Sequence, residues 1–88
     1  MRGVVMTNLQ PGIYRHFKGR EYRVHGLGND SETREVVVVY EPLYEHEGER
    51  FSVRPLSMFV EHVERDEYSG PRFALVRAEG PSIPSEEG

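Results

Sequence analysis

The alternation of apolar and polar positions is clearest in residues 21–25, where Tyr22 and Val24 fall on one face of an extended chain. The three intervening positions, which are charged or histidine, fall on the other face. A period of two is typical of a strand with one buried side. Residues 13–17 mix β-formers with polar residues and precede a Lys-Gly turn that ends at Gly19. The two segments therefore predict a β-hairpin.

The run Val-Val-Val-Val-Tyr at residues 36–40 predicts the best-covered strand of the chain. Four β-branched residues in succession disfavour a helix, and apolar side chains on both faces indicate a strand that is covered on both sides. We expect the centre of the core here. Alternation resumes at residues 51–54, which predicts that Phe51 and Val53 point inward.

The second half of the chain predicts one helical turn followed by more extended chain. Pro55 suits the first position of a short helical turn over residues 55–59. From Val60 onward, an extended strand and a two-turn helix through His62 fit the pattern about equally well. Residues 67–71 read as a turn and 73–76 as a final strand.

These elements predict a mainly β protein with one domain. About five or six short strands joined by tight turns, with one short helical turn, are typical of a small barrel or sandwich. The chain has 88 residues, too few to divide into two cores. We assign the domain to residues 11–78, treat residues 1–10 as an N-terminal extension, and expect residues 79–88 to form a disordered tail, because they hold little to bury.

Charge narrows the classes of partner. The net charge is −4, with a balance of +2 over residues 1–40 and −6 over residues 41–88. Non-specific nucleic-acid binding needs a dominant basic face, so it is not favoured. The chain has no cysteine and no apolar run long enough for a membrane span, which favours a cytoplasmic protein that does not bind membranes.

No set of residues predicts catalysis or metal binding. The four histidines are scattered, and no nucleophile motif surrounds the hydroxyls of Ser31 or Thr33. Neither His46-Glu47 nor Glu61-His62 has the spacing of metal ligands on one face. We therefore expect no enzyme, no catalytic residue, no metal and no cofactor.

Several short segments of the sequence occur together, in the same order, in one known family. They are residues 11–19, Tyr22 and Val24, residues 31–33, residues 38–40, Leu43-Tyr44, residues 53–59 and residues 71–73. The chain resembles the small bacterial family catalogued as domain of unknown function 1653. This resemblance implies an SH3-like small β-barrel or roll and implies no activity. Asp30 and Ser52 depart from the family, which commonly has His and Trp at these positions.

The remaining polar residues suggest one binding surface. Arg15, His16 and Lys18 alternate with aromatic residues in the first hairpin, a composition that suits either a binding surface or a half-buried hairpin with solvated cations. Arg54 either grips an anion or pairs with an internal acid such as Glu32. Tyr44 is the aromatic residue most suited to partial exposure, whereas Phe59 and Phe73 are expected to fill the core.

We accordingly predict a non-catalytic module that binds a protein segment. The candidate ligand-binding residues are Arg15, His16, Lys18, Glu32, Tyr44 and Arg54. The alternative is an accessory domain that binds RNA or a small ligand and serves an enzyme. Fold analogy contributes to this hypothesis and is a weak warrant for function.

Overall fold

The computed structural model describes residues 5–81 and 83–87 and has a mainly β architecture. The residues 1–4, 82 and 88 of the expected extension and tail lie outside the described residues. The elements in chain order are β1 (Val5–Leu9), β2 (Gly12–His16), β3 (Glu21–Asn29), β4 (Val36–Pro42), β5 (Ser52–Pro55), α1 (Leu56–Phe59), β6 (His62–Arg65), β7 (Tyr68–Pro71), β8 (Phe73–Ala78) and β9 (Ile83–Glu87).

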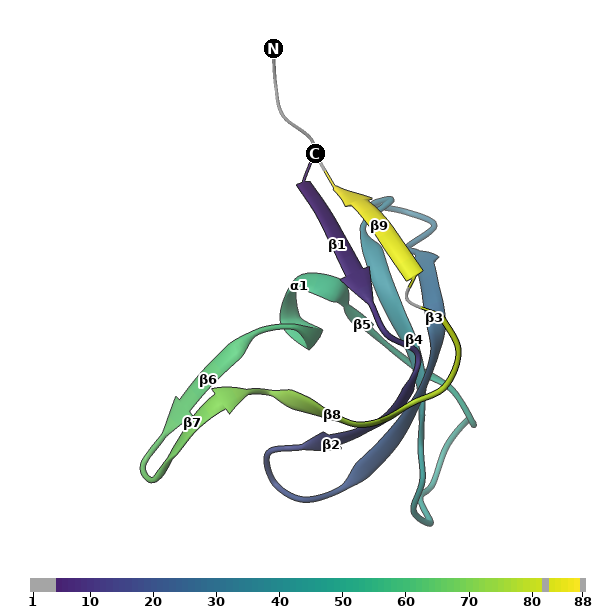
Figure 1. Cartoon of the computed structure of the whole chain (residues 1–88). Coiled ribbons are helices and arrows are strands. Elements are labelled where there is room, and N and C mark those ends of the chain that lie inside the picture. Colours follow the sequence, from purple (N-terminus) through teal and green to yellow (C-terminus); the bar gives the residue numbers. More distant parts are fainter. Residues whose placement is uncertain (1–4, 82, 88) are drawn as a thin grey trace.

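A curved five-stranded sheet in the order β5-β4-β3-β2-β8 forms the body of the protein (Figure 1). Each neighbouring pair in it is antiparallel. The β6–β7 hairpin forms its own two-stranded ladder and extends away from the sheet, so it does not join β5 to β8. The mainly β class is confirmed, but the sheet is open and the expected barrel is not closed.

The alternation in the first hairpin is confirmed. Tyr14 and Val24 are buried, Tyr22 packs against the core, and the ladder pairs Tyr14 directly with Tyr22. The strand β3 runs on to Asn29, further than the sequence predicted, and its pairing with β4 shifts between Val24 and Gly26. Such an irregularity bends a strand, which helps this long strand follow the curve of the sheet.

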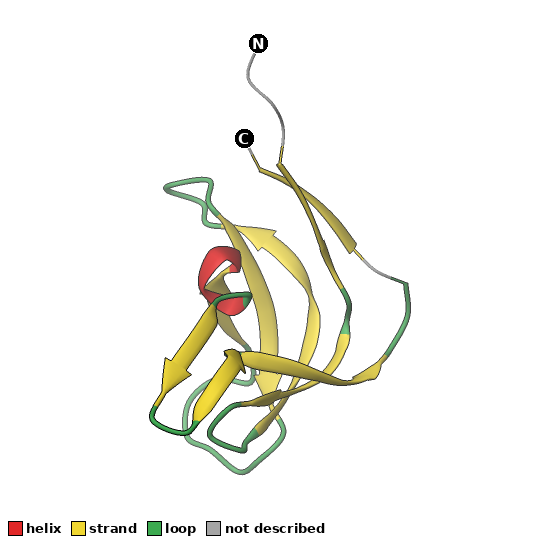
Figure 2. Ribbon diagram, turned by 60° about the vertical axis from the view of Figure 1, so that its left-hand side comes forward, coloured by secondary structure: helices red, strands yellow, loops and turns green. Residues whose placement is uncertain are grey.

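The core lies where the valine run predicted it. Val38 is fully buried, and Tyr40 on the same strand is 6% exposed. The rings of Phe59 and Phe73 stack with their centroids 4.2 Å apart, and both residues are buried, which confirms their expected role in the core. The single turn α1 therefore closes one side of the sheet through Phe59 (Figure 2).

The predicted orientation of Phe51 and Val53 is wrong, since the two side chains are 47% and 62% exposed. The register explains the difference, because Val38 pairs with Arg54 and Val39 pairs with Val53. Residues directly opposite each other in an antiparallel pair share a face. Arg54 therefore lies on the core side of β5, and Val53 lies on the outer side.

The chain after α1 is extended rather than helical. The helix ends at Phe59 and His62 begins β6, so the two-turn helix is excluded. The predicted turn at residues 67–71 is displaced, because Tyr68–Pro71 is the strand β7 and the turn falls at residues 66–67. Asp66 takes a positive φ of 33° in this turn, a conformation that Asp tolerates better than most residues.

The described residues at the end of the chain form the strand β9. The strand β9 pairs antiparallel with β1, residue by residue from Val5–Glu87 to Leu9–Ile83 (Figure 1). Main-chain pairing requires no apolar side chains, and the partner strand lies at the other end of the sequence. The local composition therefore contained no sign of it. No helix in the described part of the chain is long and apolar enough to cross a membrane.

Candidate functional site

The edge strand β8 borders a groove of about 330 Å³ that reaches the first hairpin. Its lining comes from β2, the turn after it, β7 and β8: Arg15, His16, Phe17, Gly19, Tyr68, Ala74, Leu75 and Val76. Leu75 and Val76 are 48% and 47% exposed. Apolar side chains are thus presented beside a strand edge that no described strand covers.

One wall of the groove is a short aromatic stack. The rings of His16 and Phe17 stack at 4.5 Å, and Phe17 and Tyr68 stack at 5.4 Å. The guanidinium of Arg65 lies 5.9 Å from the centre of the Phe17 ring. Tyr68 is fixed in place because its hydroxyl donates a hydrogen bond to the carbonyl of Pro71 at 2.6 Å.

The charged residues at this end differ in how far they are compensated. Arg15 Nη2 pairs with Glu21 Oε2 at 2.6 Å, in an exposed ion pair of the kind that contributes little to stability. Lys18 is exposed in the turn and makes no ion pair with any described residue. A free cation therefore stands beside the groove.

His16 connects the groove to the core side of the sheet. Its ring meets the edge of Phe73 at 5.0 Å, and its Nδ1 accepts a hydrogen bond from the backbone N–H of Lys18 at 3.1 Å. Burial lowers the pKa of His16, and the nearby charges of Arg72, Arg54 and Lys18 lower it further. The imidazole is therefore neutral at pH 7, with its proton on Nε2.

Arg54 projects from β5 onto the aromatic part of the core. Its Nε donates to the Tyr40 hydroxyl at 3.5 Å, and its guanidinium carbon lies 5.5 Å from the centre of the Phe73 ring. Neither Glu32 nor any other described carboxylate pairs with it, so the alternative of pairing with an internal acid is not observed among the described residues. Within the part of the chain that the structure describes, this half-buried cation has aromatic neighbours and no counter-charge.

Tyr44 is half-buried, as expected, and belongs to a second polar group beside Tyr22. The two hydroxyls lie 3.0 Å apart, and the Arg20 guanidinium lies 4.4 Å from the Tyr44 ring centre. Burial, followed by the hydrogen bond with Tyr44, raises the pKa of Tyr22 to about 12. The same hydrogen bond is the main cause that lowers the pKa of Tyr44. Tyr22 also contacts Phe73 at 5.6 Å, so this group adjoins Arg54.

Glu32 does not join the other candidates. It lies in the exposed β3–β4 loop, where its backbone N–H and that of Thr33 donate to Asp30 Oδ1 at 2.8 and 3.0 Å. These hydrogen bonds shape the loop locally, as Asp side chains do in turns. No described hydrogen bond joins Glu32 or Ser31 to His16, and the described residues contain no cluster of three or more metal-ligating side chains.

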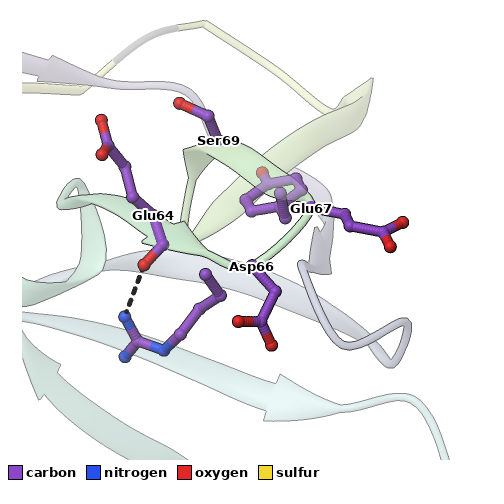
Figure 3. Close-up of a pocket in the computed structure, with 6 residues that line it drawn as sticks. Glu64, Asp66, Glu67 and Ser69 are labelled. Carbon is purple, nitrogen blue, oxygen red and sulfur yellow. Dashed lines mark hydrogen bonds between the residues drawn. The ribbon is translucent and has the colours of Figure 1, made fainter.

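A second hollow, of about 430 Å³, surrounds the turn of the β6–β7 hairpin (Figure 3). Three carboxylates line it, but the side chains of Glu64, Asp66 and Glu67 point away from one another. The Arg65 guanidinium donates to the carbonyl of Glu64 at 3.1 Å rather than to a carboxylate. Carboxylates that diverge in this way offer no convergent set of ligands.

Sequence reasoning missed two residues of the region around His16 and the groove, Arg72 and Tyr68. Arg72 Nη2 pairs with Glu61 Oε1 at 2.6 Å, and its Nε is buried without a hydrogen-bond partner among the described residues. Tyr68 lies in the predicted turn over residues 67–71 and Arg72 directly follows it, and only the folding of β7 back towards β2 brings both of them towards His16. Their positions in the sequence contained no pattern that placed them there.

Fold and surface together define a small all-β protein built on one open sheet, with a groove at one sheet edge and cations beside its aromatic core. The chain belongs to the family described as Protein of unknown function (DUF1653), whose model matches residues 12–75. The resemblance inferred from the sequence is thereby confirmed. A crystal structure of a protein of this family from Bordetella bronchiseptica is 44% identical, with a TM-score of 0.76 over 83% of this chain and 94% of that one. The comparison with curated proteins gave no match.

Proposed function

We propose that the protein is a non-catalytic binding module that recognises an extended segment of a protein partner. The observation that carries the proposal is the apolar groove along the open edge of β8. In recognition by strand addition, a partner's main chain pairs with a sheet edge while its side chains enter neighbouring pockets. The edge of β8 at Leu75 and Val76 is where the partner's main chain would pair. The Phe17–Tyr68 stack lines the neighbouring groove that would receive its side chains.

The charges near the groove favour an acidic residue within that segment. Arg15 lines the groove, and Lys18 stands in the turn beside it. Rim charges of this kind steer a partner and fix its register more than they add affinity. Charge reversal at Arg15 or Lys18 is therefore expected to slow partner capture while leaving the domain folded.

Affinity capture from the source cell, before and after nuclease treatment, tests the proposal. Leu75→Ser removes an apolar side chain from the groove, and Val53→Ser serves as its matched control on the opposite sheet edge, β5. We expect a protein that survives nuclease, is lost with Leu75→Ser and is retained with Val53→Ser. The captured segment, added as a peptide, should slow amide exchange along β8. Equal capture by both variants would contradict the proposal.

A second candidate is an accessory domain that binds RNA or a small ligand. The aromatic stack of His16, Phe17 and Tyr68 favours it, because bases stack on such rings and Arg65 adds a nearby cation. This version predicts capture that is lost on nuclease treatment or that weakens steeply with salt.

We place the action of the proposed binding module in the cytoplasm, supported by a sequence without cysteine.

A further inference from the structure

Two polar side chains from separate strands meet the ring of Phe73, and a third, Arg72, precedes it in the chain. His16 in β2 meets the ring edge at 5.0 Å, and Arg54 in β5 lies 5.5 Å from the ring centre. Arg72 directly precedes Phe73 in the chain and acts electrostatically on His16, as Lys18 also does. The fold therefore brings the guanidinium of Arg54 and the neutral imidazole of His16 to one buried ring, with the charges of Arg72 and Lys18 near that imidazole.

The positive charge here exceeds the negative charge that the described residues bring to it. Arg72 has one carboxylate partner, Glu61, whose Oε1 lies 2.6 Å from its Nη2. Arg54 and Lys18 make no ion pair with the described residues, and the Nε of Arg72 is buried without an acceptor. A half-buried guanidinium normally lies with a counter-charge, because removing it from water carries an electrostatic cost.

Hydroxyl donors lie on the same side of the core. The Tyr40 hydroxyl is 3.5 Å from Arg54 Nε, and the hydroxyls of Tyr22 and Tyr44 lie 3.0 Å from each other. The rings of Tyr22 and Tyr40 both contact Phe73, at 5.6 and 6.0 Å. Guanidinium groups bind phosphate oxygens through paired hydrogen bonds, and Tyr hydroxyls also donate to phosphate oxygens.

We propose that this group of residues, centred on Arg54 and His16, is an anion site that takes the phosphate of a phosphate monoester. A phosphate dianion balances the charges of Arg54 and Lys18, whereas a single carboxylate would leave one of them uncompensated. The planar guanidinium of Arg54 binds two phosphate oxygens at once. The Nε2–H of His16 is available as a neutral donor. This inference does not depend on strand addition at β8.

The pKa of His16 provides a direct readout of phosphate binding at this site. Burial lowers the pKa of His16, and the charges of Arg72, Arg54 and Lys18 lower it further. The carboxylate of Glu61 pairs with Arg72 at 2.6 Å. A bound phosphate adds negative charge beside the imidazole and should raise the pKa of His16. NMR titration of the wild-type protein against pH is carried out in saturating inorganic phosphate and, at equal ionic strength, in chloride. We expect a higher pKa of His16 in phosphate, and equal values in the two salts would overturn the proposal.

Variants locate the site. Arg54→Gln is expected to weaken phosphate binding at least tenfold. Arg54→Lys keeps the charge but loses the planar guanidinium, so its phosphate affinity is expected to lie between those of Arg54→Gln and the wild type. Arg77→Gln is the control, because Arg77 is an exposed cation of β8 that pairs with Glu79. Phosphate binding by Arg54→Gln that equals the wild type would overturn the assignment. If Arg54→Gln does not fold, the comparison of phosphate with chloride in the wild type decides alone.

Two further ligands identify the source of the phosphate. Phosphoserine and a nucleoside monophosphate are each added in competition with inorganic phosphate. Tighter binding of the nucleotide supports a nucleotide ligand, and tighter binding of phosphoserine supports a phosphorylated side chain. Competition by neither compound overturns the monoester assignment. Failure of the Leu75→Ser test leaves these results unaffected, so the two proposals can fail separately.

Discussion

At the scale of single residues, the energetics depend on which face of a strand a side chain occupies. Val38 and Val53 lie on neighbouring strands and have the same chemistry, yet one is fully buried and the other is 62% exposed. Burial of apolar area is the main stabilising term in a small domain, so identical substitutions at the two positions should have unequal effects.

Val38→Ala is expected to lower the free energy of unfolding by about 2 kcal/mol, because it removes two buried carbons and leaves a cavity. Val53→Ala is the matched control and should cost less than about 1 kcal/mol, since its side chain is solvated. Urea denaturation of both variants measures the difference. Equal losses would show that the register of β5 differs from the one described.

Glu41 gives a residue-level prediction about pH. Its carboxylate accepts hydrogen bonds from Arg50 Nε at 3.1 Å and from His25 Nε2 at 2.6 Å, and these contacts, Arg50 first, lower the pKa of Glu41 to about 2. A carboxyl whose pKa is lower in the folded state stabilises the fold above its unfolded pKa of about 4.5. That contribution is lost as the pH falls from there towards about 2.

Thermal unfolding of Glu41→Gln and wild type across this window tests the contribution. The difference in Tm between them should be constant above about pH 5 and should shrink steadily as the pH approaches about 2. Glu45→Gln, an exposed change in the neighbouring connection, is the control. A Tm difference for Glu41→Gln that does not vary with pH would rule out the ion pairs as its source.

At the scale of elements, the pairing of β2 with β8 depends on one glycine. Gly12 has a φ of 145°, and a Cβ placed on it would lie 2.1 Å from the carbonyl oxygen of Arg77. No rotation of a side chain relieves that contact, because both atoms belong to the backbone. The start of β2 therefore admits only glycine while β8 stays paired.

Gly12→Ala is expected to cost at least about 2 kcal/mol of unfolding free energy and to loosen the end of β8 near Ala78. Gly28→Ala is the control within β3, because its Cβ would meet only side-chain atoms of Val37 and Val39 at 3.7 Å. Denaturation measures the cost, and amide exchange shows where the sheet opens. A Gly12→Ala protein as stable as Gly28→Ala would contradict the close approach of β2 and β8.

At the scale of the whole molecule, the five-stranded sheet and the two two-stranded sheets differ in how they are supported. Most residues of the buried cluster lie in the five-stranded sheet, with Leu9 added from β1 and Leu56 and Phe59 from α1, whereas β1–β9 and β6–β7 are two-stranded ladders. Two-stranded ladders are marginal in water unless other elements pack against them. The β6–β7 hairpin has such support, because Val63 in it is 4% exposed.

Deletion of residues 82–88 is expected to leave the main unfolding transition within about 1 kcal/mol of wild type, because β9 pairs with β1 and is not a strand of the five-stranded sheet. Amides of β1 should lose their protection from exchange, because β9 is the partner strand of β1. Hydrogen exchange followed by NMR separates the two effects. Global unfolding on deletion would show that the β1–β9 ladder supports the sheet.

Much of the candidate site could be predicted from the sequence, although its arrangement could not. The cations and aromatics of the first hairpin drew attention to Arg15, His16 and Lys18, and the structure places these three around one end of the groove. Glu32 has a carboxylate suited to binding, but it lies apart in the β3–β4 loop. Arg72 was missed because its neighbourhood depends on contacts between distant parts of the chain.

The sequence by itself determined the mainly β class, the first hairpin, the buried valine strand, the helical turn after Pro55 and the family. These features follow from alternation, β-branched side chains and turn residues, whose effects act over a few neighbouring positions. Only the tertiary structure decided that Arg54 faces the core, that β9 pairs with β1, and that the sheet stays open. Each of these depends on strand register or on partners far apart in the chain, and a shift of one position in register exchanges the two faces of a strand.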